Sequence, residues 1–213
     1  MEPIKYIAIE GPIGVGKTSL ARGLAEEFKG RLVLENAEHN PFIKDFYRDR
    51  KAHAFETQMY FLLTRFKQQI ELRQADIFER YVVSVYFFAK DLIFANINLT
   101  ADELDIHRQV YEILKPRLPR PDLVIYLHAR TEVLMERIKR RNTSYEQDLD
   151  MDYMHKLVEA YNDYFFYHSS TPLLVINTSD IDFVKNKTDF MELVKEIRGA
   201  KKGTWHYIPL GSR

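Results

Sequence analysis

Cysteine is absent from the 213-residue sequence, and long apolar runs and net charge are missing as well. Without cysteine, a disulfide scaffold, a thiolate zinc site and thiol catalysis are excluded. No run of about 18 uninterrupted apolar residues occurs, so we expect no transmembrane helix. The 31 basic residues balance 31 acidic ones, which gives no general attraction to nucleic acid or to an anionic membrane. We therefore expect neither of these as a partner.

Glycine is scarce over most of the chain. Five of the eight glycines lie within the first 30 residues, and none occurs between Arg31 and Ile197. Three of them fall within Gly11–Gly16, which indicates a special backbone conformation there. Strand-like sequence begins at Ile4 and leads directly into this cluster, so we expect no signal peptide and a cytoplasmic location. The length and the 46% hydrophobic content fit one folded domain over residues 1–213.

Short apolar runs alternate with helical patterns along the chain. Strands are expected at residues 6–10, 31–35, 123–127 and 173–176. Helices are expected at 16–28, from Asn40-Pro41 onward, and at 52–72, 101–115, 131–141, 151–167 and 188–198. Thr100 and Glu103 form a capping box for the helix over 101–115. The alternation predicts an α/β fold with a five-stranded parallel sheet, helices on both faces, and ligands at the carboxyl ends of the strands.

The position of the third strand is ambiguous. β-propensity favours Tyr81–Val85, whereas spacings of three and four residues from Val82 to Ile93 are typical of a helix face. No turn residue separates Val85 from the helix that must follow it. We therefore place the strand at Ala75–Phe78 and a helix at Tyr81–Ile97, which puts Glu79 and Arg80 directly after the strand.

The glycine cluster matches a phosphate-binding loop (P-loop). Gly11-Pro-Ile-Gly14-Val-Gly16-Lys17-Thr18 fits the pattern G-x-x-x-x-G-K-[ST], after a predicted strand and before a predicted helix. The backbone N–H groups of such a loop surround phosphate oxygens, and Lys17 reaches the β- and γ-phosphates. The hydroxyl of Thr18, which Ser19 follows, suits Mg²⁺. The motif predicts a bound nucleoside triphosphate and leaves the reaction open.

An arginine-rich segment spans about residues 137–148. Arg137, Arg140 and Arg141 end a predicted helix, and polar residues follow them. This pattern is typical of the lid of a small-molecule kinase, whose arginines close over the transferring phosphates. A GTPase is disfavoured, because Asn186-Lys187-Thr188-Asp189 has the letters of a base-reading motif but follows no clear strand.

Taken together, these segments resemble the deoxynucleoside kinases, and most of all their bacterial branch of deoxyadenosine and deoxyguanosine kinases. The resemblance covers about residues 4–185 and is carried by Ile9-Glu10-Gly11, Glu35, Asn40-Pro41 through Tyr47, Phe55-Glu56-Thr57-Gln58 through Arg65, Phe78-Glu79-Arg80, Phe88-Ala89-Lys90, and the lid through Glu146. It implies transfer of the γ-phosphate of ATP, with Mg²⁺, to the 5′-hydroxyl of a deoxynucleoside in nucleotide salvage. It also implies that purines, deoxyadenosine in particular, are favoured, and that the chain forms a homodimer.

The resemblance further implies a role for each matched residue. Glu35 corresponds to the general base, Glu79 organises Mg²⁺ and Arg80 steadies the reacting phosphate. The implied catalytic set is Lys17, Glu35, Glu79, Arg80, Arg137 and Arg141. The implied substrate-binding set is Glu35, Arg80, Tyr47 and Glu146 at the sugar 3′-hydroxyl, and Gln58 and Arg65 at the base. The implied ATP-binding set is Gly11, Gly14, Gly16, Lys17, Thr18 and Ser19, with Thr18 and Glu79 at the metal.

Three positions depart from the family pattern. Tyr81 replaces a small Ser or Thr, and Thr143 replaces a lid arginine. Val85 stands where the family usually has an aspartate that pairs with the arginine matched by Arg65, and Asp91 is a candidate substitute. Two other functions are considered: a nucleoside monophosphate kinase, which would need further basic groups for the acceptor phosphate, and a non-catalytic kinase-like binding or assembly protein.

Overall fold

A six-stranded parallel sheet in the order β2-β3-β1-β4-β5-β6 forms the centre of the molecule. The computed structural model describes residues 4–74, 81–168 and 170–209. The strands are β1 (Tyr6–Glu10), β2 (Arg31–Val33), β3 (Val82–Ser84), β4 (Leu123–His128), β5 (Leu173–Asn177) and β6 (Thr204–Tyr207). The helices are α1 (Lys17–Phe28), α2 (Ile43–Arg48), α3 (Arg50–Gln74), α4 (Lys90–Asn98), α5 (Ala101–Leu114), α6 (Thr131–Arg141), α7 (Met151–Phe166) and α8 (Lys187–Arg198). Short 3₁₀ turns are η1 (Ala37–His39), η2 (Lys115–Arg117) and η3 (Ser144–Glu146).

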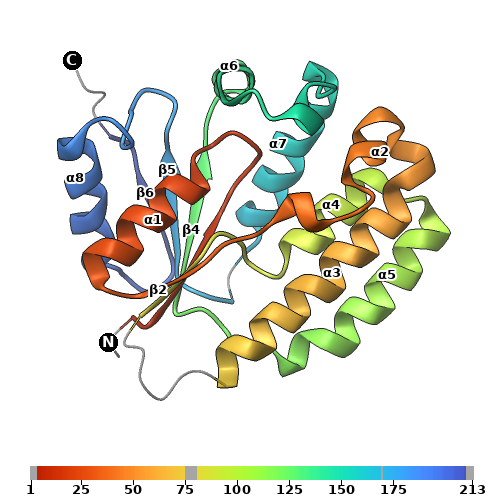
Figure 1. The fold of residues 1–213 in the computed structure, drawn as a ribbon. Helices are drawn as coiled ribbons and strands as arrows, with labels where there is room; N and C mark the ends of the chain where they lie inside the picture. Colours follow the sequence, from red (N-terminus) through yellow and green to blue (C-terminus); the bar gives the residue numbers. More distant parts are fainter. Residues whose placement is uncertain (1–3, 75–80, 169, 210–213) are drawn as a thin grey trace.

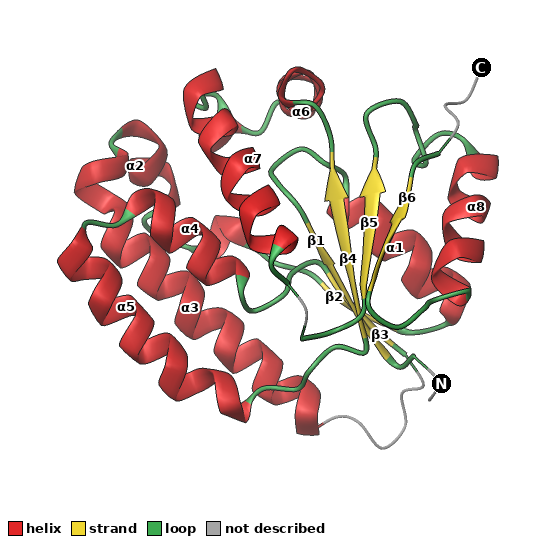
Figure 2. Cartoon of the chain, turned by 180° about the vertical axis from the view of Figure 1, so that it is seen from behind, coloured by secondary structure: helices red, strands yellow, loops and turns green. Residues whose placement is uncertain are grey.

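Helices cover both faces of the sheet. Figure 1 shows α1 and α8 on one side and α3, α4, α5 and α7 on the other. Viewed from behind in Figure 2, α6 lies beyond the carboxyl ends of β4 and β5. The central strands are therefore apolar along their whole length: Leu123–Leu127 of β4 and Ile7–Ile9 of β1 are almost completely buried. The loops that follow the strands lie together at the carboxyl ends of the strands.

Most elements agree with the sequence prediction. The strands at 6–10, 123–127 and 173–176 and the helices at 131–141, 151–167 and 188–198 lie within two residues of their predicted bounds. The capping box before α5 is present, since the Thr100 amide donates to the Glu103 carboxylate at 2.9 Å. Asn40 acts as expected on the backbone N–H of Phe42, although α2 begins only at Ile43. Asn186 caps α8, because its side chain accepts from the N–H groups of Thr188 and Asp189. The segment Asn186-Lys187-Thr188-Asp189, which has the letters of a base-reading motif, is therefore the start of a helix.

The third strand was predicted in the wrong place. β3 spans Val82–Ser84 and pairs in parallel with β1 through Tyr6↔Val82 and with β2 through Arg31↔Val82. The predicted helix over Tyr81–Ile97 is also wrong, because a loop follows β3 and α4 begins at Lys90. Residues 75–80, including Glu79 and Arg80, lie outside the described residues. Because β3 comes after Glu79 and Arg80 in the chain, these two residues do not follow the third strand as predicted.

The sheet has six strands where five were predicted. β6 pairs in parallel with β5 through Leu173↔Thr204 and Ile176↔Tyr207. Its side chains are exposed or partly exposed, as expected for an edge strand. The sequence of β6 therefore has no buried apolar run of the kind that marks the central strands.

Candidate active site

One cavity of about 780 Å³ opens at the carboxyl ends of the strands and contains most of the predicted site. The P-loop, the segment after β2, α2, α3, the segment from Val85 to α4, the end of α6 and the segment after β5 all contribute to its wall. The predicted residues that line it are Gly14, Gly16, Lys17, Thr18, Ser19, Glu35, Tyr47, Gln58, Arg65, Arg137, Arg141 and Glu146. Sequence positions more than 120 residues apart are thus brought to one cavity, as expected for the carboxyl-end edge of a parallel sheet.

Two glycines allow the P-loop to leave β1 and enter α1. Gly11 has a φ of +148°, and a Cβ on it would lie 2.2 Å from the carbonyl oxygen of Leu127. Gly16 has a φ of +103° and caps α1 in the left-handed conformation. Neither backbone conformation suits a residue with a side chain. The loop therefore presents its N–H groups together with the amino end of α1, which attracts anions.

Lys17 lies at the start of α1 and turns back over the loop. Its ammonium donates to the carbonyl oxygens of Gly11 at 2.7 Å and Pro12 at 3.0 Å. Burial lowers the pKa of Lys17 to about 7, and repulsion from Lys90 contributes. A bound polyphosphate would raise this pKa again, because a nearby anion favours the charged form. The ammonium is thus held where a phosphate can replace the two carbonyls as its partner.

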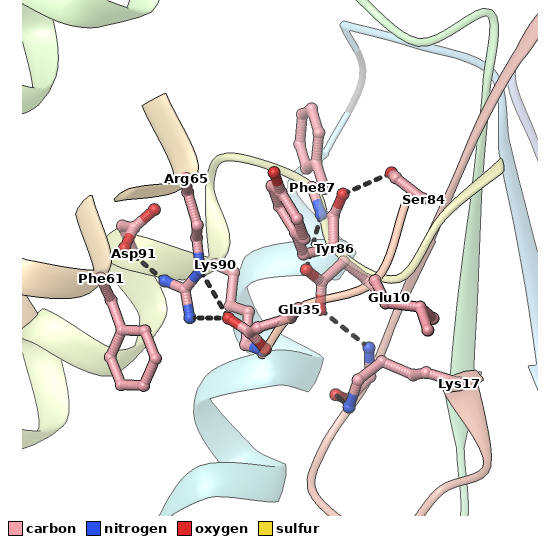
Figure 3. A network of polar contacts seen from close by, with 12 residues as sticks. Glu10, Lys17, Glu35, Phe61, Arg65, Ser84, Tyr86, Phe87, Lys90 and Asp91 are labelled. Carbon is pink, nitrogen blue, oxygen red and sulfur yellow. Dashed lines mark hydrogen bonds and ion pairs between the residues drawn. The ribbon is translucent and has the colours of Figure 1, made fainter. Parts of the chain in front are cut away.

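Glu35, just beyond β2, is shared by two cations. Its carboxylate accepts from Arg65 Nε at 2.7 Å and is also ion-paired with Arg65 Nη2 and with Lys90 Nζ (Figure 3). Burial alone would raise its pKa, but Arg65 and Lys90 outweigh burial and hold the pKa of Glu35 well below its usual range. The side chain keeps 16% of its surface exposed, toward the cavity that it lines. Glu35 is therefore ionised and accessible to a hydroxyl in the cavity.

Arg65 is almost completely buried and joins two carboxylates. Besides Glu35 it pairs with Asp91 of α4, so the substitute acid suggested by the sequence is confirmed. The guanidinium also lies 4.6 Å from the ring centroid of Phe61. Val85 lines the cavity directly after β3, and not on a helix as predicted. Two of the five N–H groups of Arg65 face Glu35 and a third faces Asp91, so few remain for a ligand.

Tyr47 and Glu146 also line the cavity. Both are buried, and the ring of Tyr47 stacks on that of Tyr145 at 5.8 Å. Arg141, at the end of α6, pairs with the carboxylate of Glu146. Burial raises the pKa of Tyr47 well above its ordinary value, which keeps its hydroxyl protonated as a hydrogen-bond donor. A hydroxyl, a carboxylate and an arginine thus meet at one side of the cavity.

Gln58 brings a buried amide into the cavity from α3. Gln58 is 2% exposed and lines the cavity, and its side chain takes part in no hydrogen bond found among the described residues. Seven residues, or about two helical turns, separate it from Arg65, which places both on one face of α3. A buried amide with unused donor and acceptor groups suits a ligand that offers both in return.

Arg137 has a different environment from Arg140 and Arg141. Its guanidinium donates to the carbonyl oxygens of Thr178 at 2.8 Å, Ile181 at 3.3 Å and Val15 at 3.5 Å. It therefore connects α6 to the P-loop and to the segment after β5. Arg140 pairs with Glu136 on the surface of the same helix. The three arginines predicted as one lid group thus divide into one that joins backbone segments and two with carboxylate partners.

Glu10 was not predicted as a site residue, although it sits at the carboxyl end of β1. It is completely buried and accepts from Gly11 N at 3.0 Å, Phe87 N at 2.7 Å and the Tyr161 hydroxyl at 3.0 Å. Burial raises its pKa, and the nearby Lys90 and Lys17 oppose this. Since both oxygens are engaged, Glu10 fits a structural link between the P-loop and the segment after β3 better than a metal ligand.

Lys90 was missed as a site residue, and Asp91 was expected only as a partner of Arg65. Lys90 and Asp91 are buried charges at the start of α4, and each pairs with a predicted residue. Adjacent opposite charges at a helix start are common on protein surfaces, so the residue types of Lys90 and Asp91 do not by themselves predict that they are buried. Among the described residues, no group of three His, Asp or Glu side chains could hold a metal ion. The Thr18 hydroxyl at the cavity fits a Mg²⁺ that takes its other ligands from phosphate and water.

None of the helices in the described part of the chain combines the length and hydropathy needed to cross a bilayer.

The family model for deoxynucleoside kinases matches residues 7–200. The chain is 33% identical over 205 residues to the deoxyguanosine kinase of Bacillus subtilis (strain 168), covering 93% of this chain and 98% of the relative. It is 32% identical over 208 residues to the deoxyadenosine kinase of Lactobacillus acidophilus, covering 91% and 95%.

Solved structures agree with the fold. The structure of deoxyadenosine kinase from M. mycoides with bound dATP superposes with a TM-score of 0.77 at 25% identity and covers 90% of this chain and 98% of that one. The resemblance inferred from the motifs is thereby confirmed. A P-loop and a buried carboxylate at one cavity, and a family match over nearly the whole described fold, lead to one conclusion: the chain belongs to the deoxynucleoside kinase family and is an ATP-dependent phosphotransferase.

Proposed function

We propose that the chain transfers the γ-phosphate of ATP to the 5′-hydroxyl of a purine deoxynucleoside, with deoxyadenosine the favoured acceptor. The observation that carries the proposal is that Lys17 and Glu35 line the same cavity. A donor phosphate held by the P-loop and a hydroxyl at Glu35 would then meet within one enclosed space. The relatives named for deoxyguanosine and for deoxyadenosine support a purine as the base.

The preference for adenine rests on Gln58 and Arg65. Adenine offers one donor and one acceptor on its N6/N7 edge, which a glutamine amide matches with two hydrogen bonds. Guanine offers two acceptors on the corresponding edge, and these suit an arginine or lysine. Arg65 is occupied by Glu35 and Asp91, whereas the amide of Gln58 is available in the cavity. The donor and acceptor pattern therefore favours deoxyadenosine.

Each of these residues has a proposed role in the transfer. Glu35 accepts the proton of the 5′-hydroxyl, which then attacks the γ-phosphorus in line with the leaving ADP. Lys17 neutralises charge on the β- and γ-phosphates, and Arg141 does so from the lid side. Tyr47 and Glu146 hold the sugar 3′-hydroxyl. Thr18, and Glu79 outside the described residues, would hold Mg²⁺, which neutralises further phosphate charge when bound.

The test is ADP release with ATP and each of the four deoxynucleosides and their monophosphates as acceptors. We expect turnover with the nucleosides, fastest with deoxyadenosine, and none with the monophosphates. A faster reaction with a pyrimidine nucleoside would contradict the purine assignment, and turnover with monophosphates alone would contradict the acceptor class. The expected homodimer is measured on the same sample by light scattering, and the cytoplasmic location by cell fractionation.

A further inference from the structure

Lys90 is a second ammonium group, besides Lys17, in the wall of the active-site cavity. It begins α4, is 7% exposed and is ion-paired with Glu35. Its Nζ lies 5.6 Å from the ring centroid of Phe94, which also lines the cavity. Figure 3 shows Lys90 and Arg65 converging on Glu35, with Lys17 nearby. Such a buried lysine needs an anionic partner throughout any reaction that changes the charge around it.

Hydrogen bonds fix the segment between β3 and α4, which leads to Lys90. The N–H of Phe87 donates to Glu10 at 2.7 Å, and Glu10 also accepts from Gly11 of the P-loop. The hydroxyl of Ser84 donates to the carbonyl oxygen of Tyr86 at 2.7 Å. The P-loop and the start of α4 thus share one buried carboxylate, which fixes Lys90 relative to Lys17.

The charges of Lys90 and Lys17 act on each other. Repulsion from Lys90 adds to burial in lowering the pKa of Lys17 to about 7. Two ammonium groups at one cavity are stabilised when an anion binds between them, because each then gains an opposite charge. A phosphoryl group passing from the P-loop toward Glu35 is such an anion.

We propose that Lys90 binds the phosphoryl group during its transfer to the 5′-oxygen, the role that sequence analysis gave to Arg80. This inference rests on the proposed function. As the bond from the 5′-oxygen to the γ-phosphorus forms, the bond from that phosphorus to the oxygen of the leaving ADP breaks. The hydroxyl proton moves to Glu35, whose negative charge is thereby lost. Lys90 then exchanges its carboxylate partner for the oxygens of the transferred phosphate, so that its charge remains paired.

The test compares Lys90→Met with Lys90→Arg, with Lys156→Met as the control at an exposed lysine of α7. We expect Lys90→Met to lower kcat by about 10²–10³-fold, the usual effect of removing one group that stabilises transition-state charge. The KM for the deoxynucleoside should change by less than about threefold, since the contact is made mainly to the phosphoryl group. Lys90→Arg should retain most of the activity, and Lys156→Met all of it.

Calorimetric titration separates this role from a structural one. We expect Lys90→Met to weaken binding of the deoxynucleoside 5′-monophosphate by about tenfold or more and that of the deoxynucleoside by less than about threefold. A Lys90 that only supports Glu35 would weaken both ligands alike. Equal losses, or a folded Lys90→Met with a kcat within about threefold of the parent, would overturn the proposal.

The outcomes for the parent protein keep the two proposals apart. If the parent phosphorylates deoxynucleosides and Lys90→Met does too, only the role of Lys90 is rejected. If the parent phosphorylates none of them, the proposed function and this inference are both rejected. If Lys90→Met does not fold, Lys90→Arg decides: a folded Lys90→Arg that no longer binds the monophosphate more tightly than the nucleoside contradicts a role for the positive charge.

Discussion

The Glu35 carboxylate must be ionised before the reaction and must take up a proton during it, and these two requirements favour opposite shifts of its pKa. It must accept a proton, yet Arg65 and Lys90 hold its pKa well below the usual range. A weak base is disfavoured as a proton acceptor, but it is fully ionised at any physiological pH. Both requirements are met if the negative charge of the incoming phosphoryl group attracts Lys90. Glu35 then loses one of its two cationic partners, and its pKa rises as the phosphoryl group is transferred. The same residue would then be ionised before the reaction and protonated during it.

Replacing Glu35 with glutamine keeps the shape of the side chain and removes the base. We expect Glu35→Gln to lower kcat by roughly 10²–10⁴-fold, with the affinity for the deoxynucleoside largely kept. Steady-state kinetics with deoxyadenosine measure both quantities. Glu159→Gln, at an exposed carboxylate of α7 that does not line the cavity, is the matched control. Activity of Glu35→Gln within a few-fold of the parent would mean that another group accepts the proton.

Among the elements, β3 shows where sequence reasoning succeeds and where it stops. The P-loop, β1, β4 and α6 were predicted because turn residues and polar positions mark their ends. β3 is short and buried within a parallel sheet, so it has no polar alternation, and a buried run of this kind cannot be told from a helix by periodicity. The matching spacings from Val82 to Ile93 run across a strand, a loop and a helix, and are coincidental.

The site was predictable to the extent that its residues belong to a motif. Lys17, Glu35, Tyr47, Gln58 and Glu146 do line one cavity. The contributions of Glu10 and Lys90 depend on which segments pack at the end of the sheet, and that is tertiary information. With Ala75–Phe78 predicted as the strand, Glu79 and Arg80 were expected at the carboxyl end of the sheet. The segment that follows the observed strand β3 leads instead to Lys90.

Gly11 tests how tightly β1 and β4 constrain the P-loop. Gly11→Ala would bring a Cβ within 2.2 Å of the Leu127 carbonyl oxygen at a φ of +148°. We expect the free energy of unfolding to fall by more than about 2 kcal/mol, through backbone strain and displacement of the loop. Gly199→Ala is the control, because its φ of −83° suits alanine and its nearest neighbour lies at 3.4 Å. Equal unfolding curves for the two variants would contradict this account.

His107 makes the packing of α5 dependent on pH. It is completely buried, and neither ring nitrogen has a hydrogen-bond partner among the described residues. Burial, with repulsion from Arg65, lowers its pKa to about 4 from 6.5 in the unfolded chain. The unfolded chain therefore binds more protons between these values, and stability falls as the pH is lowered through this window. The full loss is about 3 kcal/mol near pH 4.

The measurement is urea unfolding between pH 7 and pH 4 for the parent and for His107→Leu. Acidic groups titrate in both proteins, so the difference between the two profiles isolates the histidine. We expect the parent to lose more stability than His107→Leu as the pH falls below 6.5. Parallel profiles would show that His107 is protonated as easily in the folded protein as in the unfolded one.

At the scale of the whole molecule, one cavity joins a donor half built on the P-loop and α6 with an acceptor half built on α2 and α3. Each half should bind its substrate independently enough to be measured by thermal unfolding. A ligand at 100 times its Kd adds about 2.7 kcal/mol, which raises the Tm of a chain of this length by roughly 5–10 °C. We expect Lys17→Ala to abolish the shift caused by ATP, abolish phosphoryl transfer, and keep the shift caused by the deoxynucleoside. Loss of both shifts would mean that the two halves form a single binding unit.

Arg137 determines where α6 can bend. Its bonds to the carbonyl oxygens of Val15, Thr178 and Ile181 connect the middle of that helix to two other segments of the molecule. Any swing that carries Arg140 and Arg141 over a bound nucleotide must then take place beyond Arg137. The helix ends four residues later, where Asn142 adopts a left-handed φ of 53°. Arg137 would thus be the fixed point of such a movement, and the backbone at Val15, Thr178 and Ile181 would keep its position while the end of α6 moved.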